Sequence, residues 1–196
     1  MNRILTIGHS NHAWVDFLNL LQIYGVNALV DVRSQPFSSR FPQYSKVSLQ
    51  ASLAAAGIAY VFLGKELGAR CSDRACYTKG QVDFERVART ETFKCGLSRV
   101  REGAERFSVA MMCAEKEPLD CHRTILVARQ LHESGCEVAH ILADASVEPH
   151  AVSQRRLLAE LGISELDMFR DRAEALADAY RLRGQQIAFR PESEEE

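Results

Sequence analysis

The chain has 196 residues, of which 46% are hydrophobic and 26% charged, and its net charge is −2. These are the values of an ordinary globular domain with its own core, and they exclude intrinsic disorder over most of the length. No apolar stretch approaches the roughly 20 residues that a membrane helix needs. No secretory signal follows Met1, so we expect a cytoplasmic protein without a membrane partner. Six scattered cysteines indicate no disulfide framework.

The charge is distributed unevenly along the chain. Residues 33–129 carry 16 Lys and Arg against 10 Asp and Glu, whereas residues 130–196 are acidic. A net-acidic chain with a basic middle argues against a general nucleic-acid coat. The same distribution allows a local site for an anion.

Five short apolar runs predict β-strands. They contain little alternation of polar and apolar residues, which is typical of strands that helices cover on both faces. The runs lie at residues 3–8, 28–32, 59–63, 107–112 and 137–142.

Helical patterns separate these runs, and three of the predicted helices end at a glycine shortly before a strand. This order is typical of successive βα units. We expect the first helix to begin at an N-cap, Ser10 or Asn11, and to end at Gly25. The other helices are expected at residues 47–56, 83–104 with a break near Thr90, 120–135 with Asp120 as N-cap, 150–161 and 165–183.

These elements predict a three-layer α/β/α fold, Rossmann-like, with a mostly parallel sheet of about five strands. We expect a single domain over residues 1–190, with a C-terminal helical extension from about residue 150 and a disordered acidic tail at 191–196.

Chemically capable residues gather at the predicted ends of the strands. Parallel α/β sheets bind ligands in the crevice outside these carboxyl ends. The candidate residues are Gly8, His9 and Ser10 after the first strand, Asp31, Arg33 and Arg40 after the second, Glu66 after the third, Cys113 and Glu115 after the fourth, and Cys121, His122 and Arg123 at the start of the next helix.

The segment 113–123 gives the most specific signal. We expect Cys113 to face the crevice, beside a helix N-terminus whose free N–H groups and dipole favour an anion and lower the pKa of a cysteine. This order of strand, cysteine, loop, arginine and helix is similar to that of cysteine phosphatases and sulfurtransferases, although the loop between Cys113 and Arg123 is longer here.

Structural roles stay open for the same residues. Cys113 can be a buried core cysteine, Asp31 and Arg33 can pair with each other, and Glu66 or Glu115 can be solvated. Metal binding is a weak option, because Cys71 and Cys76 are separated by four residues but the sequence offers no Cys-x₂-Cys pair with a matching second element, so no metal site is predicted.

Four blocks of the sequence stand out: TIGHS at 6–10, VDVRS at 30–34 with Pro36 and Arg40, LGKELG at 63–68 and CAEKEPLDCHR at 113–123. Together they resemble the family called domain of unknown function 488. The blocks keep the order and spacing of that family, and Ala69 departs from its frequent second glycine. The family has no established activity, so the resemblance implies where a site lies and not which reaction it performs. The similarity covers about residues 3–187.

The leading hypothesis is a small enzyme that binds an anionic ligand containing a phosphate or a nucleotide. In this hypothesis Arg33, Arg40 and Arg123 hold the anion. Cys113 is the nucleophile or redox thiolate, His9 or His122 carries the proton, and Glu115 is the acid or base. The sequence identifies no cofactor.

Two alternatives stay open. In the first, an enzyme acts on a nucleoside or base with Glu115 and His9, and Cys113 is structural. In the second, the protein binds nucleic acid or a partner without catalysis, and aromatic side chains of the loop after the second strand stack on bases. These aromatic residues are Phe37, Phe41 and Tyr44.

Overall fold

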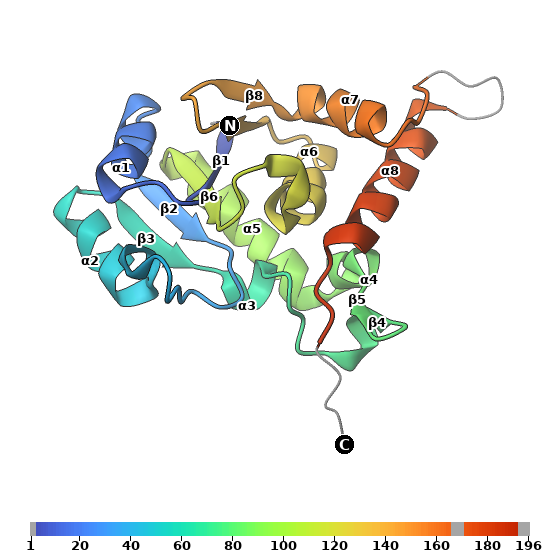
Figure 1. Cartoon of the computed structure of the whole chain (residues 1–196), viewed down its shortest axis with the longest axis horizontal. Helices are drawn as coiled ribbons and strands as arrows, with labels where there is room; N and C mark the ends of the chain where they lie inside the picture. The colour runs from blue at the N-terminus through green and yellow to red at the C-terminus, as the bar shows by residue number, and fades with distance from the viewer. Residues whose placement is uncertain (1–2, 166–170, 192–196) are drawn as a thin grey trace.

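A six-stranded sheet forms the centre of the structure, a computed structural model that describes residues 3–165 and 171–191 (Figure 1). Its strands are β1 (Ile4–Gly8), β2 (Ala28–Asp31), β3 (Ala59–Phe62), β6 (Val109–Cys113), β7 (Val138–Ile141) and β8 (Val147–Pro149). They lie in the order β3-β2-β6-β1-β7-β8. The first five in this order are parallel, and β8 pairs antiparallel with β7 at one edge.

The five predicted strands are confirmed, with small shifts at their ends. Sequence reasoning missed β8, because three residues carry too short a pattern to distinguish a strand from a loop. It also missed the hairpin of β4 (Tyr77–Thr78) and β5 (Gln81–Val82), whose strands are only two residues long.

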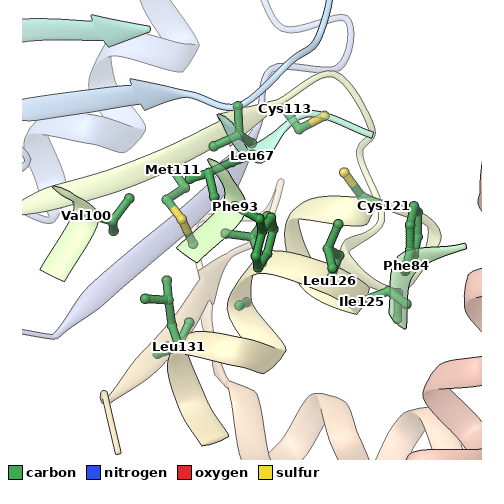
Figure 2. Close-up of a cluster of buried hydrophobic side chains, with 14 of the residues drawn as sticks. Leu67, Phe84, Phe93, Val100, Met111, Cys113, Cys121, Ile125, Leu126 and Leu131 are labelled. Atoms are coloured by element: carbon green, nitrogen blue, oxygen red, sulfur yellow. The ribbon is translucent and has the colours of Figure 1, made fainter. Parts of the chain in front are cut away.

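The inner strands bury side chains on both faces. Along β6, Val109, Met111 and Cys113 belong to one buried cluster, whereas Ala110 and Met112 belong to the other. Successive side chains of a strand point to opposite faces, so a strand covered on both sides needs apolar residues at every position. Figure 2 shows part of the first cluster, with the sulfur atoms of Cys113 and Cys121 at its upper end.

Helices cover both faces of this sheet, which confirms the predicted three-layer α/β/α fold (Figure 1). On one face α1 (Trp14–Ile23) and α2 (Lys46–Ala55) bury residues such as Phe17 and Leu53. On the other face α5 (Glu91–Arg106) buries Phe93. The remaining helices are α3 (Gly64–Leu67), α4 (Phe84–Arg89), α6 (Arg129–Glu133), α7 (His150–Glu160) and α8 (Arg172–Ile187).

The break predicted near Thr90 is confirmed, since it divides α4 from α5. The Asp83 carboxylate accepts hydrogen bonds from the first backbone N–H groups of α4. The Thr90 hydroxyl accepts one from the N–H of Phe93, 3.2 Å away. Each helix therefore has its own N-cap.

Two predicted N-caps are wrong. Ala13, not Ser10 or Asn11, occupies the N-cap of α1, and Ser10 adopts a positive φ of 46° instead. Asp120 caps nothing, because a 3₁₀ turn ends there and its carboxylate pairs with Arg183 at 2.7 Å. The next helix begins after it with a π-helical turn, Arg123–Ala128, that leads into α6.

The last predicted helix begins later than expected. α8 starts at Arg172, behind a capping box formed by Asp171 and Glu174, and not at residue 165. The predicted disordered tail, except for residue 191, lies outside the described residues. No helix in the described ranges is long and apolar enough to cross a bilayer.

Candidate functional site

A pocket of about 840 Å³ lies at the carboxyl edge of the sheet. Residues from the ends of three neighbouring strands line it: His9 after β1, Arg33 after β2 and Cys113 at the end of β6. Ligands of parallel α/β sheets bind beyond these strand ends. The pocket therefore lies where the fold favours a binding site.

Two segments that sequence reasoning did not connect with the site complete the pocket. Arg70 comes from the loop after α3, and Phe189 follows the end of α8. The Arg70 guanidinium lies over the Phe189 ring, 4.3 Å from its centroid, and the Arg70 backbone N–H donates to Ser34 Oγ at 2.9 Å. The segment after α8 therefore contributes one wall of the pocket whose other walls come from the strand ends.

The side chain of Arg33 is held by other groups of the protein, which is the structural role that the sequence left open for it. Its guanidinium donates two hydrogen bonds to the Asp31 carboxylate, at 2.9 and 2.7 Å, and one to the Tyr44 carbonyl at 2.8 Å. Asp31 is fully buried and accepts a further hydrogen bond from the Tyr60 hydroxyl. Most of the donor capacity of Arg33 is therefore used inside the protein.

Both ring nitrogens of His9 are engaged by protein groups. Nδ1 donates to the Ser10 carbonyl at 2.9 Å, and Nε2 accepts from the Arg33 guanidinium at 3.2 Å. Burial, together with the positive charge of Arg33, lowers the pKa of His9 to about 4. The ring also stacks on Tyr44, with 4.2 Å between centroids. His9 is therefore a neutral ring that supports Arg33.

Cys113, Cys121 and His122 form a buried cluster at the floor of the pocket. Their two Sγ atoms and the His122 ring nitrogen lie within 4.8 Å of one another. His122 Nδ1 is 3.6 Å from Cys113 Sγ and 3.9 Å from Cys121 Sγ. Its Nε2 lies 3.0 Å from the Val32 carbonyl, which can only accept, so Nε2 carries a proton. This contact aims Nδ1 at the sulfur atoms.

The direction of the cysteine pKa shift differs from the sequence prediction. The hydrogen bond to Cys121, followed by burial, raises the pKa of the Cys113 thiol well above its ordinary value. Burial opposes ionisation of Cys121 too, but the Cys113 thiol, Arg123 and His122 together lower the pKa of Cys121. The backbone N–H of Arg123 also points at Cys121 Sγ, 3.5 Å away. Within the pair, Cys121 is therefore the thiol that ionises more readily.

Arg123 does not line the pocket, but it holds in place a loop that does. It is fully buried, and its guanidinium donates to the Glu115 carbonyl at 2.6 Å and to the Lys116 carbonyl at 3.3 Å. These bonds hold the loop after β6 over the end of β1. Gly8 lies where this loop crosses the end of β1. A Cβ built at Gly8 would be 1.9 Å from the Glu115 carbonyl oxygen. Gly8 thus serves close backbone packing.

Replacing Gly8 with alanine is expected to lower the free energy of unfolding by about 1–3 kcal/mol, because the new methyl group overpacks against a fixed carbonyl. Chemical denaturation measures the loss. Gly103→Ala is the matched control, since its Cβ meets nothing nearer than 3.9 Å within a helix. We expect that variant to gain about 0.5–1 kcal/mol. Equal stability of the two variants would contradict the close crossing at Gly8.

Three cations at the pocket have no acidic partner among the residues that the structure describes: Arg40, Arg70 and Lys116. Sequence reasoning proposed Arg40 but missed Arg70, which lies in the loop after α3, and Lys116, which directly follows the candidate Glu115. Phe37 lines the same pocket and is 73% exposed, whereas Tyr44 is fully buried. Tyr44 therefore packs on His9 and is not available for stacking on bases.

The two candidate carboxylates have different positions. Glu115 lines the pocket, and burial raises its pKa. Glu66 does not line it, because its carboxylate pairs with Arg99 of α5 at 2.6 Å. Ser10 and Cys121 also border the pocket, whereas Gly8, Asp31 and Arg123 lie behind its wall.

Comparison with known proteins identifies a family and no described relative. The model of the family "Domain of unknown function DUF488" matches residues 13–130. The match includes the second, third and fourth blocks of the resemblance, and the TIGHS block lies before it. Neither the curated proteins nor the solved structures gave a match.

Proposed function

Because this chain belongs to the DUF488 family, whose description assigns no activity, we propose a function from the geometry of the pocket. The protein is an enzyme for a small anionic ligand that carries a phosphate group or is a nucleotide. Arg40, Arg70 and Lys116 bind the anion, and the reaction takes place at the floor, beside Cys113, Cys121 and His122.

The three pocket cations without acidic partners carry this proposal. A charged side chain that already has a carboxylate partner gains little from a ligand, whereas a free one gains a charge-assisted hydrogen bond. Arg70 is also oriented before any ligand binds, through its contact with Phe189. Such preorganisation reduces the entropy that binding costs.

Arg33 and Arg123 have a supporting role in the proposed site. Arg33 fixes the loop after β2 through Asp31 and Tyr44, and Arg123 fixes the loop after β6 through two carbonyl groups. These two loops present the pocket residues. The charge of Arg33 is balanced by Asp31, whereas Arg123 donates only to carbonyl groups and adds positive charge near the floor, which favours an anion over a neutral ligand.

The floor supplies the groups that chemistry requires. Sulfur and imidazole groups lie within contact distance of each other, and the Glu115 carboxylate borders the same space. Such groups serve as nucleophile, metal ligand or proton carrier in enzymes. This combination of groups supports an enzyme over a module that only binds its ligand.

Thermal unfolding with inorganic phosphate, pyrophosphate and a nucleoside triphosphate tests the anion site. At a concentration about 100 times Kd, linkage adds about 2.7 kcal/mol and raises Tm by roughly 5–10 °C. Arg40→Gln, Arg70→Gln and Lys116→Gln are each expected to weaken binding about 10-fold or more, since a hydrogen bond to a charged group contributes about 1.5–3 kcal/mol. Isothermal titration gives the affinities.

Lys65→Gln is the control, because Lys65 is an exposed cation that does not line the pocket. It should bind these anions as the unchanged protein does. Equal losses in Lys65→Gln and in the pocket variants would overturn the proposal. If instead a single-stranded oligonucleotide binds and its affinity falls steeply between roughly 50 and 200 mM salt, the nucleic-acid alternative is the correct one.

A further inference from the structure

We infer that Cys113, Cys121 and His122 form a binding site for a transition-metal ion of the zinc class, with its remaining coordination position open to the pocket. This inference deepens the proposed function, since the metal would be the reactive centre at the floor of the same site. Metal binding is measured without any anionic ligand, so the two proposals can fail separately.

The distances match the geometry of such a site. Zinc binds cysteine sulfur at about 2.3 Å and histidine nitrogen at about 2.0–2.1 Å, in a tetrahedral arrangement. Two such ligands are then about 3.6 Å apart across a tetrahedral edge. His122 Nδ1 lies 3.6 Å from Cys113 Sγ and 3.9 Å from Cys121 Sγ. Small side-chain rotations bring all three atoms onto one ion.

The surroundings of the three ligands fit a metal site as well. Metal-bound histidines usually donate their second ring N–H to a carbonyl or carboxylate, which fixes the ring orientation. His122 Nε2 makes this contact with the Val32 carbonyl at 3.0 Å. The Arg123 N–H directed at Cys121 Sγ and the buried Arg123 side chain offset the negative charge of bound thiolates.

Three protein ligands leave a fourth position for water or substrate, which is the pattern of catalytic and not of structural zinc. All three ligands border the pocket, so the open position faces the space where the anion is proposed to bind. Glu115 borders this space too, two residues after a ligand cysteine. A metal there lowers the pKa of bound water and polarises an oxygen of the substrate.

The spacing of the three ligands explains why the sequence did not predict a metal site. Cys113 ends a strand, and Cys121 and His122 lie beyond a loop and a 3₁₀ turn. Zinc motifs with a sequence signature carry their cysteines two to four residues apart. Here the path of the chain from the end of β6 to the next helix brings the three ligand side chains together.

Cobalt and zinc titration of the reduced, metal-free full chain tests the inference. We expect one equivalent of Co²⁺ to produce a thiolate-to-cobalt charge-transfer band and the intense visible bands of tetrahedral coordination, and Zn²⁺ to displace it. Bound Zn²⁺ should also slow alkylation of Cys113 and Cys121, read by mass spectrometry at each cysteine, without slowing that of Cys71 or Cys95.

Ligand variants show whether the ion occupies this cluster. Cys121→Ser and His122→Gln are each expected to weaken Zn²⁺ binding about 100-fold or more, beyond the effect of losing a supporting contact. Cys71→Ser is the control, since Cys71 lies outside the cluster, and its affinity should stay unchanged. If a ligand variant fails to fold, the alkylation protection in the unchanged protein still decides.

Three results would overturn the inference: reduced protein that binds no cobalt or zinc, zinc affinity that survives Cys121→Ser and His122→Gln, or protection from alkylation at Cys71 instead of the cluster. Metal binding without any response to phosphate, pyrophosphate or nucleotide would leave the metal site standing and refute the proposed anion site. Anion binding by a protein without metal affinity would leave the anion site standing and refute the metal site.

Discussion

Replacing Arg33 with methionine is expected to lower the free energy of unfolding by about 3–5 kcal/mol, because it leaves a buried carboxylate without its cation. Asp31 is fully buried and receives two hydrogen bonds from the guanidinium, and the Tyr44 carbonyl receives a third. The Tyr60 hydroxyl and one backbone N–H remain for Asp31 in the variant. They do not neutralise the charge. Urea unfolding monitored by circular dichroism measures the effect.

The exposed pair of Arg99 and Glu66 is the control for this prediction. Arg99 is half exposed, and its ion pair is screened by water. Arg99→Met should therefore cost at most about 1 kcal/mol. The double variant Asp31→Asn with Arg33→Met should recover part of the loss, since it removes the unpaired charge. A loss in Arg33→Met no larger than in Arg99→Met would show that Arg33 does not act as this internal support.

Lowering the pH from 7.5 to 5.5 is expected to remove about 4 kcal/mol of stability through three buried histidines. His140 Nε2 lies 3.0 Å from His150 Nδ1, and His150 Nε2 lies 2.9 Å from the Tyr180 hydroxyl. Burial, with positive charge from neighbouring side chains, lowers the pKa of His140 well below 6.5 and that of His150 to about 3. His9, with a pKa of about 4, is the third.

The sign follows from proton binding in the two states. In the unfolded chain each histidine takes up a proton near pH 6.5, whereas in the folded protein it stays neutral until a much lower pH. The unfolded state therefore binds more protons below pH 6.5. Stability is complete above this pH and is lost as the pH falls, by up to about 1.4 kcal/mol per pH unit for each group.

Urea unfolding at several pH values between 7.5 and 5.5 measures this dependence. His150→Gln should flatten it by about a third, because one of the three groups no longer titrates. His12→Gln is the control and should leave the slope unchanged, since the ring of His12 makes no contact of this kind in the described chain. A stability that stays constant over this range would contradict the buried neutral state of the histidines.

The sequence predicted the layers of the fold because burial on both faces produces a signal within each strand. Continuous apolar runs identified β1, β2, β3, β6 and β7, and glycines after the helices identified the connections. The N-caps at Ser10 and Asp120 were predicted from residue type alone. The structure uses Ser10 in a turn beside the pocket and Asp120 in a pair with Arg183, and both roles depend on distant segments.

The candidate site was predictable where it depends on strand ends and not where it depends on packing between segments. Cys113, Cys121 and His122 were all named from the sequence, but their convergence depends on the path of the loop between them. Arg70 and Phe189 are far apart in the chain, and no local pattern connects them. For Arg33 the sequence identified the residue but not its role. Only its contacts in the structure show that it supports the pocket.

An anomalous difference map from crystals soaked in tungstate, a heavy tetrahedral analogue of phosphate, shows whether an anion binds in the pocket. We expect a peak inside the pocket, in contact with at least two of Arg40, Arg70 and Lys116, that disappears when phosphate is added. A pocket that stays empty while tungstate binds elsewhere on the surface, or a peak that phosphate does not displace, would contradict an anion site at the carboxyl edge of this sheet.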